Sequence, residues 1–117
     1  MYKINKSFSF DSAHSLPHLE DGHKCKNVHG HTYKTTFYFK SEKLNKDGFV
    51  IDFNETKSIK KYIDDFLDHK NLNEVITIAT TSENICKFLY LKFKLSFEQL
   101  YAVSIEETPT SFAIYEE

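Results

Sequence analysis

Cysteine is scarce in this sequence, which has only Cys25 and Cys86 among its 117 residues. Two cysteines are too few for a disulfide framework, and a reducing compartment keeps both as thiols. The sequence also lacks an apolar run of the roughly 18 residues that suggest a membrane span. Its first residues, MYKINKSFSFDSAH, contain no apolar signal-peptide core. We therefore expect a cytoplasmic protein with two free thiols.

A strong charge of either sign is missing as well. The formal net charge is −2 and the pI is near 6.3, so there is no basic footprint for nucleic acid or an anionic membrane. Internal repeats and low-complexity segments are also absent. What the sequence does have is a 40% hydrophobic share with 11 phenylalanines and 7 tyrosines, which indicates a packed core. We expect one domain over residues 1–117.

Hydrophobic periodicity predicts the secondary structure. Residues 2–10 alternate as a strand that continues towards His14, and residues 33–40, 49–53, 101–107 and 111–115 read as further strands, the last two as a hairpin around Pro109. One helix is expected after an Asn54 cap, with Ile59, Tyr62, Ile63, Phe66 and Leu67 on its apolar face. Thr80 and Glu83 fit a capping box that opens a second helix.

The order of these elements predicts an α+β fold with an antiparallel sheet of four to five strands and two helices on one face. Such a sheet leaves two edges exposed. Edges of this kind are often paired or covered, and joining the sheets of neighbouring subunits is one solution.

Three histidines are the main candidates for a metal site. In an extended backbone His29 and His31 leave the same face, and His14 leaves the same face as Phe8 and Phe10. Together the three could form a zinc site with an open fourth position, although a lone histidine is more often a surface or hydrogen-bonded residue. His18 and His23 are spare candidates without a supporting spacing.

The two cysteines differ in their neighbours. Cys25 lies between Lys24 and Lys26, where a nearby cation or histidine can favour a reactive thiolate, although a buried apolar role is the alternative. Cys86 lies in the second expected helix among apolar residues and is interpreted as packing.

Asp68, His69 and Glu107 are further candidates. Asp68 could orient His69 for proton transfer, but the side chains of adjacent residues rarely hydrogen-bond each other. The alternative, which explains the pair equally well, is a helix C-terminus at which His69 interacts favourably with the helix dipole. Glu107 is in phase with the apolar face of its strand, where an unpaired carboxylate is unfavourable. It could hold a ligand with adjacent N–H donors, such as a guanidine-like edge, bidentately.

Taken together, these residues form a pattern that resembles a known family. The segments F-S-F-D-S-A-H-S-L-P-H, G-H-K-C-K-N-V-H-G-H-T-Y, G-F-V-I-D-F, L-D-H-K-N-L-N, T-S-E-N and E-E-T occur in the order typical of the 6-carboxy- and 6-pyruvoyl-tetrahydropterin synthase family. Each motif is weak alone, but their combination over residues 8–115 is specific.

The resemblance implies a role for each candidate. His14, His29 and His31 would bind Zn²⁺, whose open position takes side-chain oxygens of the substrate. Cys25 would act as general acid and base, and Asp68 with His69 would form a second proton-transfer unit that usually reaches the site from a neighbouring subunit. The remaining implied residues contact the substrate: Glu107 anchors the amino-pyrimidine edge of the pterin, Thr81 and Ser82 add hydrogen bonds, and His23 and Lys24 are candidates for the phosphates.

The resemblance also implies an activity and an assembly. Cys25 lies three residues before H-G-H, which resembles the bacterial carboxy-forming branch on the queuosine route. That branch converts 7,8-dihydroneopterin triphosphate to 6-carboxy-5,6,7,8-tetrahydropterin, acetaldehyde and triphosphate. The alternatives are the pyruvoyl-forming reaction and a non-catalytic zinc module closed by Cys25. The implied fold is the tunnelling fold, in which subunits join their sheets into a barrel, usually as a homohexamer of two stacked trimers.

Overall fold

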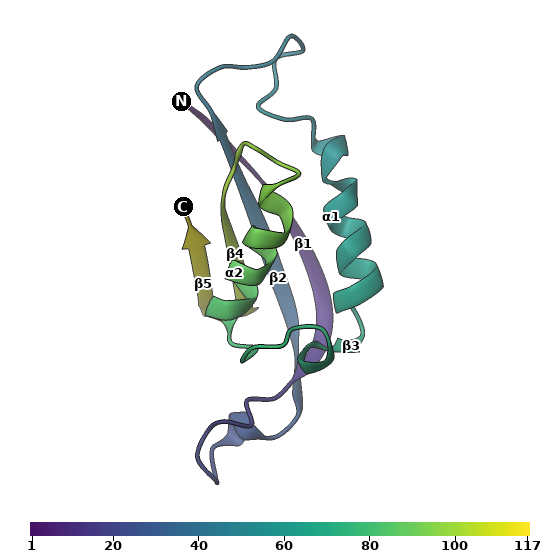
Figure 1. Cartoon of the computed structure of the whole chain (residues 1–117), viewed down its shortest axis with the longest axis vertical. Coiled ribbons are helices and arrows are strands. Elements are labelled where there is room, and N and C mark those ends of the chain that lie inside the picture. Colours follow the sequence, from purple (N-terminus) through teal and green to yellow (C-terminus); the bar gives the residue numbers. More distant parts are fainter.

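The computed structural model describes residues 1–117 as a five-stranded sheet with two helices on one face (Figure 1). The strands follow the order β3-β1-β2-β4-β5 across the sheet. Their bounds are β1 Tyr2–His14, β2 His29–Ser41, β3 Lys70–Asn71, β4 Leu100–Thr108 and β5 Ser111–Glu116. The helices are α1, Lys57–Tyr62, and α2, Ser82–Lys94. The α+β class and the C-terminal hairpin are as predicted.

The long β1–β2 hairpin is the central element of the molecule, whose longest dimension is 55 Å. The two strands pair antiparallel along their whole length, with Tyr2 opposite Ser41 and His14 opposite His29. Because side chains alternate between the two faces, one face of the hairpin carries core residues such as Phe10 and Phe37, and the same face continues to the histidines. The loop between the strands, residues 15–28, projects beyond the helices (Figure 1).

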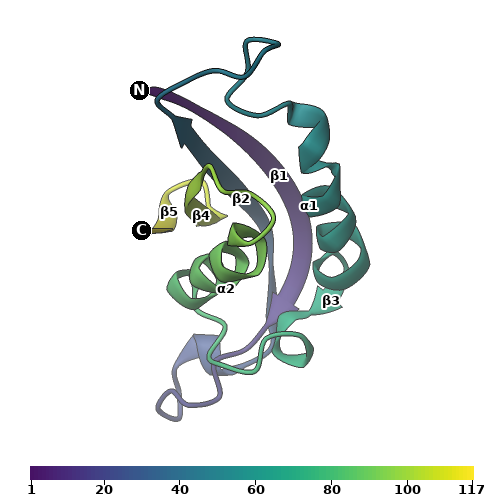
Figure 2. The ribbon, with the colours of Figure 1, turned by 45° about the horizontal axis from the view of Figure 1, so that its top comes forward.

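The two helices share the core face of the sheet (Figure 2). Phe93 of α2 packs edge-on against Phe37 of β2 and also against Tyr62 of α1, with ring centroids 5.6 and 5.7 Å apart. Helix α1 continues without a break into a π-helical turn, Ile63–Leu67, which adds two buried side chains to the core. Neither helix is long and apolar enough to cross a membrane.

Two predictions about the segment before α1 are wrong. Residues 49–53 form no strand, because Val50 and Ile51 are buried against the core without pairing to a neighbour. The helical cap is Asp52 rather than Asn54. The Asp52 carboxylate accepts a hydrogen bond from the Asn54 amide, and the Glu55 carboxylate accepts one from the Asp52 amide. This capping box opens a short 3-10 turn, Phe53–Thr56, that leads into α1.

The predicted cap of α2 is shifted by one residue. Thr81, not Thr80, is the N-cap, and its hydroxyl accepts a hydrogen bond from the Asn84 amide at 3.2 Å. Thr80 turns away from the helix, because its carbonyl and hydroxyl are both used by His14.

The sheet is mixed rather than wholly antiparallel. The unpredicted strand β3 pairs parallel with β1, but only at Ser12 and Ala13. The rest of the outer edge of β1 has no strand beside it, and neither has the outer edge of β5. The two exposed edges that the sequence predicts are therefore present in the isolated chain.

The difference in burial between a leucine in α2 and a leucine just after it predicts how substitution of each one affects stability. Leu89 is fully buried in the core, so Leu89→Ala should lower the free energy of unfolding by about 2–5 kcal/mol. Leu95, just after the helix, is 97% exposed, so Leu95→Ala should change it by less than about 0.5 kcal/mol. Urea denaturation followed by circular dichroism measures both, and equal effects of the two variants would contradict the packing described here.

Candidate metal centre and active site

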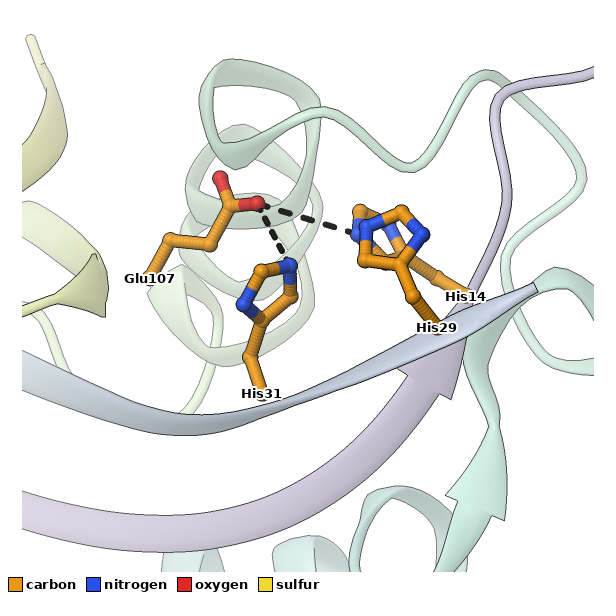
Figure 3. A group of neighbouring side chains, drawn as sticks. All are labelled: His14, His29, His31 and Glu107. Atoms are coloured by element: carbon orange, nitrogen blue, oxygen red, sulfur yellow. Dashed lines mark ion pairs between the residues drawn. The ribbon is translucent and has the colours of Figure 1, made fainter. Parts of the chain in front are cut away.

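Three histidines and one glutamate converge at the end of the β1–β2 hairpin. His14 ends β1, His29 begins β2 and His31 follows two residues later on the same face. The ring centroids of His14 and His29 are 4.6 Å apart, and those of His29 and His31 are 4.9 Å apart. Glu107, near the end of β4, faces the three imidazoles (Figure 3).

Backbone carbonyls fix the tautomers of two of the histidines. The Nδ1 of His14 lies 2.9 Å from the Thr80 carbonyl oxygen, and the Nδ1 of His29 lies 2.7 Å from the Asn27 carbonyl oxygen. A carbonyl oxygen only accepts, so each Nδ1 carries the proton and donates it. Each Nε2 is then left with a free lone pair, which is the form of imidazole that binds a metal ion.

Burial favours the neutral form of two of the histidines, His14 and His31. His14 is 1% exposed, and burial lowers the pKa of its side chain below the ordinary value. Burial also lowers the pKa of His31, against the opposing effect of the Glu107 charge. Tyr33 lies behind the cluster, fully buried, with its ring centroid 5.4 Å from that of His31. The Tyr33 hydroxyl has no hydrogen-bond partner, and burial raises its pKa.

Glu107 brings a carboxylate into the histidine cluster. Its Oε1 lies 2.7 Å from the Nε2 of His31 and 3.8 Å from the Nε2 of His14 (Figure 3). Neither imidazole nitrogen is aligned for a hydrogen bond. The other carboxylate oxygen, Oε2, accepts a hydrogen bond of 2.9 Å from the Ser82 hydroxyl.

The donor set suits a divalent cation of borderline softness. The four ligand atoms of His14, His29, His31 and Glu107 all lie within 4.8 Å of one another. The buried Nε2 atoms of His14 and His31 have no hydrogen-bond partner in the protein, which is unfavourable for buried polar atoms. Imidazole nitrogens with one carboxylate are typical ligands of zinc. The residues present therefore fit such an ion.

Cys25 lies beside this cluster on a cavity of about 400 Å³. Lys24, His29, His31 and Glu107 line the same cavity. The backbone fixes the position of Cys25 from both sides: its amide donates to the Nδ1 of His23, and its carbonyl accepts from the Leu16 amide. Cys25 is not one of the four residues whose ligand atoms converge. Cys25 is therefore part of the cavity wall next to the histidines.

Asp68 and His69 lie outside this cavity, at the outer edge of β1. The Asp68 carboxylate accepts from the Asp11 amide, and the His69 amide donates to the Asp11 carbonyl oxygen. The backbone of His69 has a positive φ of 56°, which is strained for a residue other than glycine. The imidazole is 74% exposed and lines a second, shallow depression of about 600 Å³ that His31 also borders.

The other predicted residues take positions around the start of α2. The Thr81 hydroxyl is used to cap the helix, and the Ser82 hydroxyl is used by Glu107. His18 and His23 are exposed in the loop and do not join the cluster. Sequence reasoning missed Thr80 and Asn27, whose carbonyl groups orient two histidines. Every residue has a backbone carbonyl, so the residue type does not reveal these contacts. The only hint in the sequence was the run of hydroxyl residues 80–82.

Fold and site together define the class of protein: an α+β protein in which three histidines and a glutamate that could hold a metal ion lie next to a cavity lined by Cys25. A sequence model of the family described as 6-pyruvoyl tetrahydropterin synthase matches residues 3–117. The chain is 41% identical to 6-carboxy-5,6,7,8-tetrahydropterin synthase of Haemophilus influenzae, with both chains covered fully. It is 35% identical to the Synechocystis protein of the same name, over 98% of this chain and 93% of that one.

The fold agrees with these sequence matches. The structure of Caenorhabditis elegans 6-pyruvoyl tetrahydropterin synthase superimposes with a TM-score of 0.87 at 29% identity, covering 99% of this chain and 95% of that one. The chain belongs to the 6-pyruvoyl tetrahydropterin synthase family. It is an enzyme of that family, a lyase.

The contrast between the two cysteines gives a direct prediction. Cys86 is 1% exposed, and burial raises the pKa of its thiol to about 11, so it stays protonated and unreactive at pH 8. Cys25 is half-buried on the cavity. Iodoacetamide should therefore modify one thiol per native chain, mapped to Cys25 by mass spectrometry, and both thiols in urea. Modification of Cys86 in the native Cys25→Ser variant would contradict this assignment.

Proposed function

We propose that this chain is a zinc-dependent lyase of the carboxy-forming branch of the family, acting on the queuosine route. Its substrate is 7,8-dihydroneopterin triphosphate, and its products are 6-carboxy-5,6,7,8-tetrahydropterin, acetaldehyde and triphosphate. The observation that carries the proposal is the convergence of three histidines, two of which direct a free Nε2 lone pair away from the backbone, beside Cys25 on one cavity. The names of the two bacterial relatives, both carboxy-forming enzymes, support this branch.

The proposed roles follow from the positions of the side chains. His14, His29 and His31 would hold the zinc ion, which supplies Lewis-acid chemistry that acidifies carbon-bound protons of the substrate side chain. Cys25, on the cavity wall, would accept and return a proton at that side chain. Glu107 would bind the adjacent N–H donors of the pterin ring.

Four more residues would contact the substrate from the edges of the cavity. Thr81 and Ser82 lie at the N-terminus of α2 on the side of Glu107, where they would add hydrogen bonds to the pterin. Lys24 lines the cavity and His23 precedes it, which makes them candidates for the triphosphate. A lysine ammonium acts on a phosphate as a point charge.

The proton-transfer role of Asp68 and His69 requires a neighbouring subunit. Neither residue lines the cavity of Cys25, and the His69 imidazole is exposed. The unpaired edges of β1 and β5 allow the sheets of adjacent subunits to join. We propose that one domain, residues 1–117, assembles in this way into a barrel-forming homohexamer, and that Asp68 and His69 of one subunit serve the Cys25 of the next.

The main alternative keeps the site and changes the product. A 6-pyruvoyl-tetrahydropterin synthase removes triphosphate from the same substrate without releasing acetaldehyde, and the C. elegans protein with a TM-score of 0.87 carries that name. The same histidines, thiol and carboxylate would serve both reactions.

A non-catalytic zinc module is a more distant alternative. A structural zinc site is normally closed by four protein ligands, and Cys25 is not among the four residues whose ligand atoms converge. Glu107 is the group that could close the site, but it borders the cavity with a side chain that is 27% exposed. A ligand bordering a cavity is accessible to exchange, which favours the enzyme.

The first test is a product assay. Zinc-loaded protein incubated with 7,8-dihydroneopterin triphosphate should release acetaldehyde, measured by coupling to alcohol dehydrogenase, together with a carboxylated tetrahydropterin identified by mass spectrometry. Triphosphate release without acetaldehyde would assign the pyruvoyl-forming reaction instead. Absence of turnover in the zinc-loaded protein would count against both.

Two variants test the roles of Cys25 and His69. Cys25→Ala should lower kcat by about 10²–10⁴, because a general acid and base contributes that much, while zinc content measured by atomic absorption stays unchanged. His69→Asn should lower kcat similarly, and asparagine tolerates the positive φ at this position.

Coexpression of the two variants tests whether the site is shared. If Cys25 and His69 act from different subunits, mixed oligomers contain some sites with both groups intact and regain part of the wild-type activity. Mixed oligomers as inactive as each variant alone would show that both groups act within one chain.

A further inference from the structure

The Glu107 carboxylate points at the histidine cluster. Its Oε1 lies 2.7 Å from His31 Nε2 and 3.8 Å from His14 Nε2 (Figure 3). The tautomer of His14 is set by the Thr80 carbonyl, so the Nε2 atom that faces Glu107 carries a lone pair and no proton. Two hydrogen-bond acceptors that face each other in a buried site repel, and a cation between them removes the repulsion.

The second oxygen of the carboxylate is held by another element. Ser82, the first residue of α2, donates its hydroxyl proton to Glu107 Oε2 at 2.9 Å. The N-terminus of a helix also carries partial positive charge, which stabilises a carboxylate placed there. With Oε2 held in this way, Oε1 is the one oxygen directed at the histidines.

This position conflicts with binding a pterin. Recognition of adjacent N–H donors uses both oxygens of a carboxylate at once. In the structure one oxygen of Glu107 faces the histidines and the other accepts from Ser82. Oε2 can accept a second hydrogen bond beside that of Ser82, but Oε1 has to leave the histidines before both oxygens can hold the pterin edge.

The backbone around Glu107 allows such a change. The register of β4 with β5 shifts between Glu106 and Thr108, so Glu107 lies at a bulge in the strand. A bulge leaves its extra residue out of the regular ladder, and bulges occur next to active sites where they re-aim a side chain. The Glu107 side chain also borders the cavity of about 400 Å³ into which it can move.

We propose that Glu107 alternates between two positions: it is a fourth metal ligand in the substrate-free enzyme, and it leaves the metal to hold the amino-pyrimidine edge of the arriving pterin. The inference rests on the proposed function for the identity of the ligand. The pterin ring, rather than the triphosphate, then opens a coordination position. Anionic small molecules without the N–H edge meet a metal whose fourth position is already taken by a carboxylate.

Metal affinity and the visible spectrum of the cobalt(II)-substituted protein test the first position. Glu107→Gln removes the charge and the anionic ligand, so metal affinity, measured by competition with a chelator, should fall at least tenfold and the cobalt spectrum should shift. Glu106→Gln is the matched control, because Glu106 is the neighbouring residue on the opposite face of β4 and is not one of the converging ligands. Equal affinities and spectra of Glu107→Gln and wild type would overturn the proposal.

The second position is tested on the wild-type protein, which avoids any effect of substitution on folding. The probe is 2-aminopyrimidin-4-one, which carries the N–H edge of the pterin but lacks its second ring and side chain. At millimolar concentration it should change the cobalt spectrum of the wild type and of Glu106→Gln, and leave that of Glu107→Gln unchanged. Sodium tripolyphosphate should have no effect.

Two outcomes would overturn the switch. If the pyrimidine probe leaves the wild-type spectrum unchanged although Glu107→Gln alters it, Glu107 is a permanent ligand. If tripolyphosphate changes the spectrum as the probe does, the opening is not specific to the pterin edge. Neither readout depends on turnover, so failure of the switch is distinct from failure of the proposed reaction.

Discussion

The register between β1 and β2 is the constraint on which both the core and the site depend. His14 lies opposite His29, and the same register places Phe10 opposite Tyr33 on the core face. A slip of one residue would turn the histidines and the buried aromatic residues to the solvent face together. Burial of Phe37 and its neighbours therefore also brings the three imidazoles to one face of the hairpin, where backbone carbonyls orient two of them.

The start of α2 connects this hairpin to the last strands. Three consecutive hydroxyl residues have three different contacts there: Thr80 orients His14, Thr81 caps the helix, and Ser82 donates to Glu107. A change in the position of this helix end would therefore reach the histidines and the carboxylate at the same time.

The features that could be predicted from the sequence are those that depend on the local periodicity of a strand. The common face of His14, His29 and His31 follows from the two-residue period of a strand, and the buried phase of Glu107 follows from its place after Val103 and Ile105. The parallel strand β3 was missed because two residues carry no periodic signal and its position depends on where the chain returns after α1.

The contacts of the candidate residues were harder to predict. The approach of Glu107 to the histidines depends on a bulge in β4 and on Ser82 from another element, neither of which follows from spacing. The strand expected at residues 49–53 was wrong because burial there occurs without pairing. The roles of Cys25, Asp68 and His69 stay predictions, since they concern a substrate and a neighbouring subunit.

The order of the ligands along the chain has a consequence for biosynthesis. His14, His29 and His31 belong to one local hairpin, whereas Thr80 comes later and Glu107 lies near the C-terminal end. Contacts close in sequence form at lower entropic cost than distant ones. On the ribosome the three imidazoles therefore exist before the carboxylate has been synthesised. The side chains of the local cluster are therefore available first, and Glu107, which faces them in the folded protein, is added last.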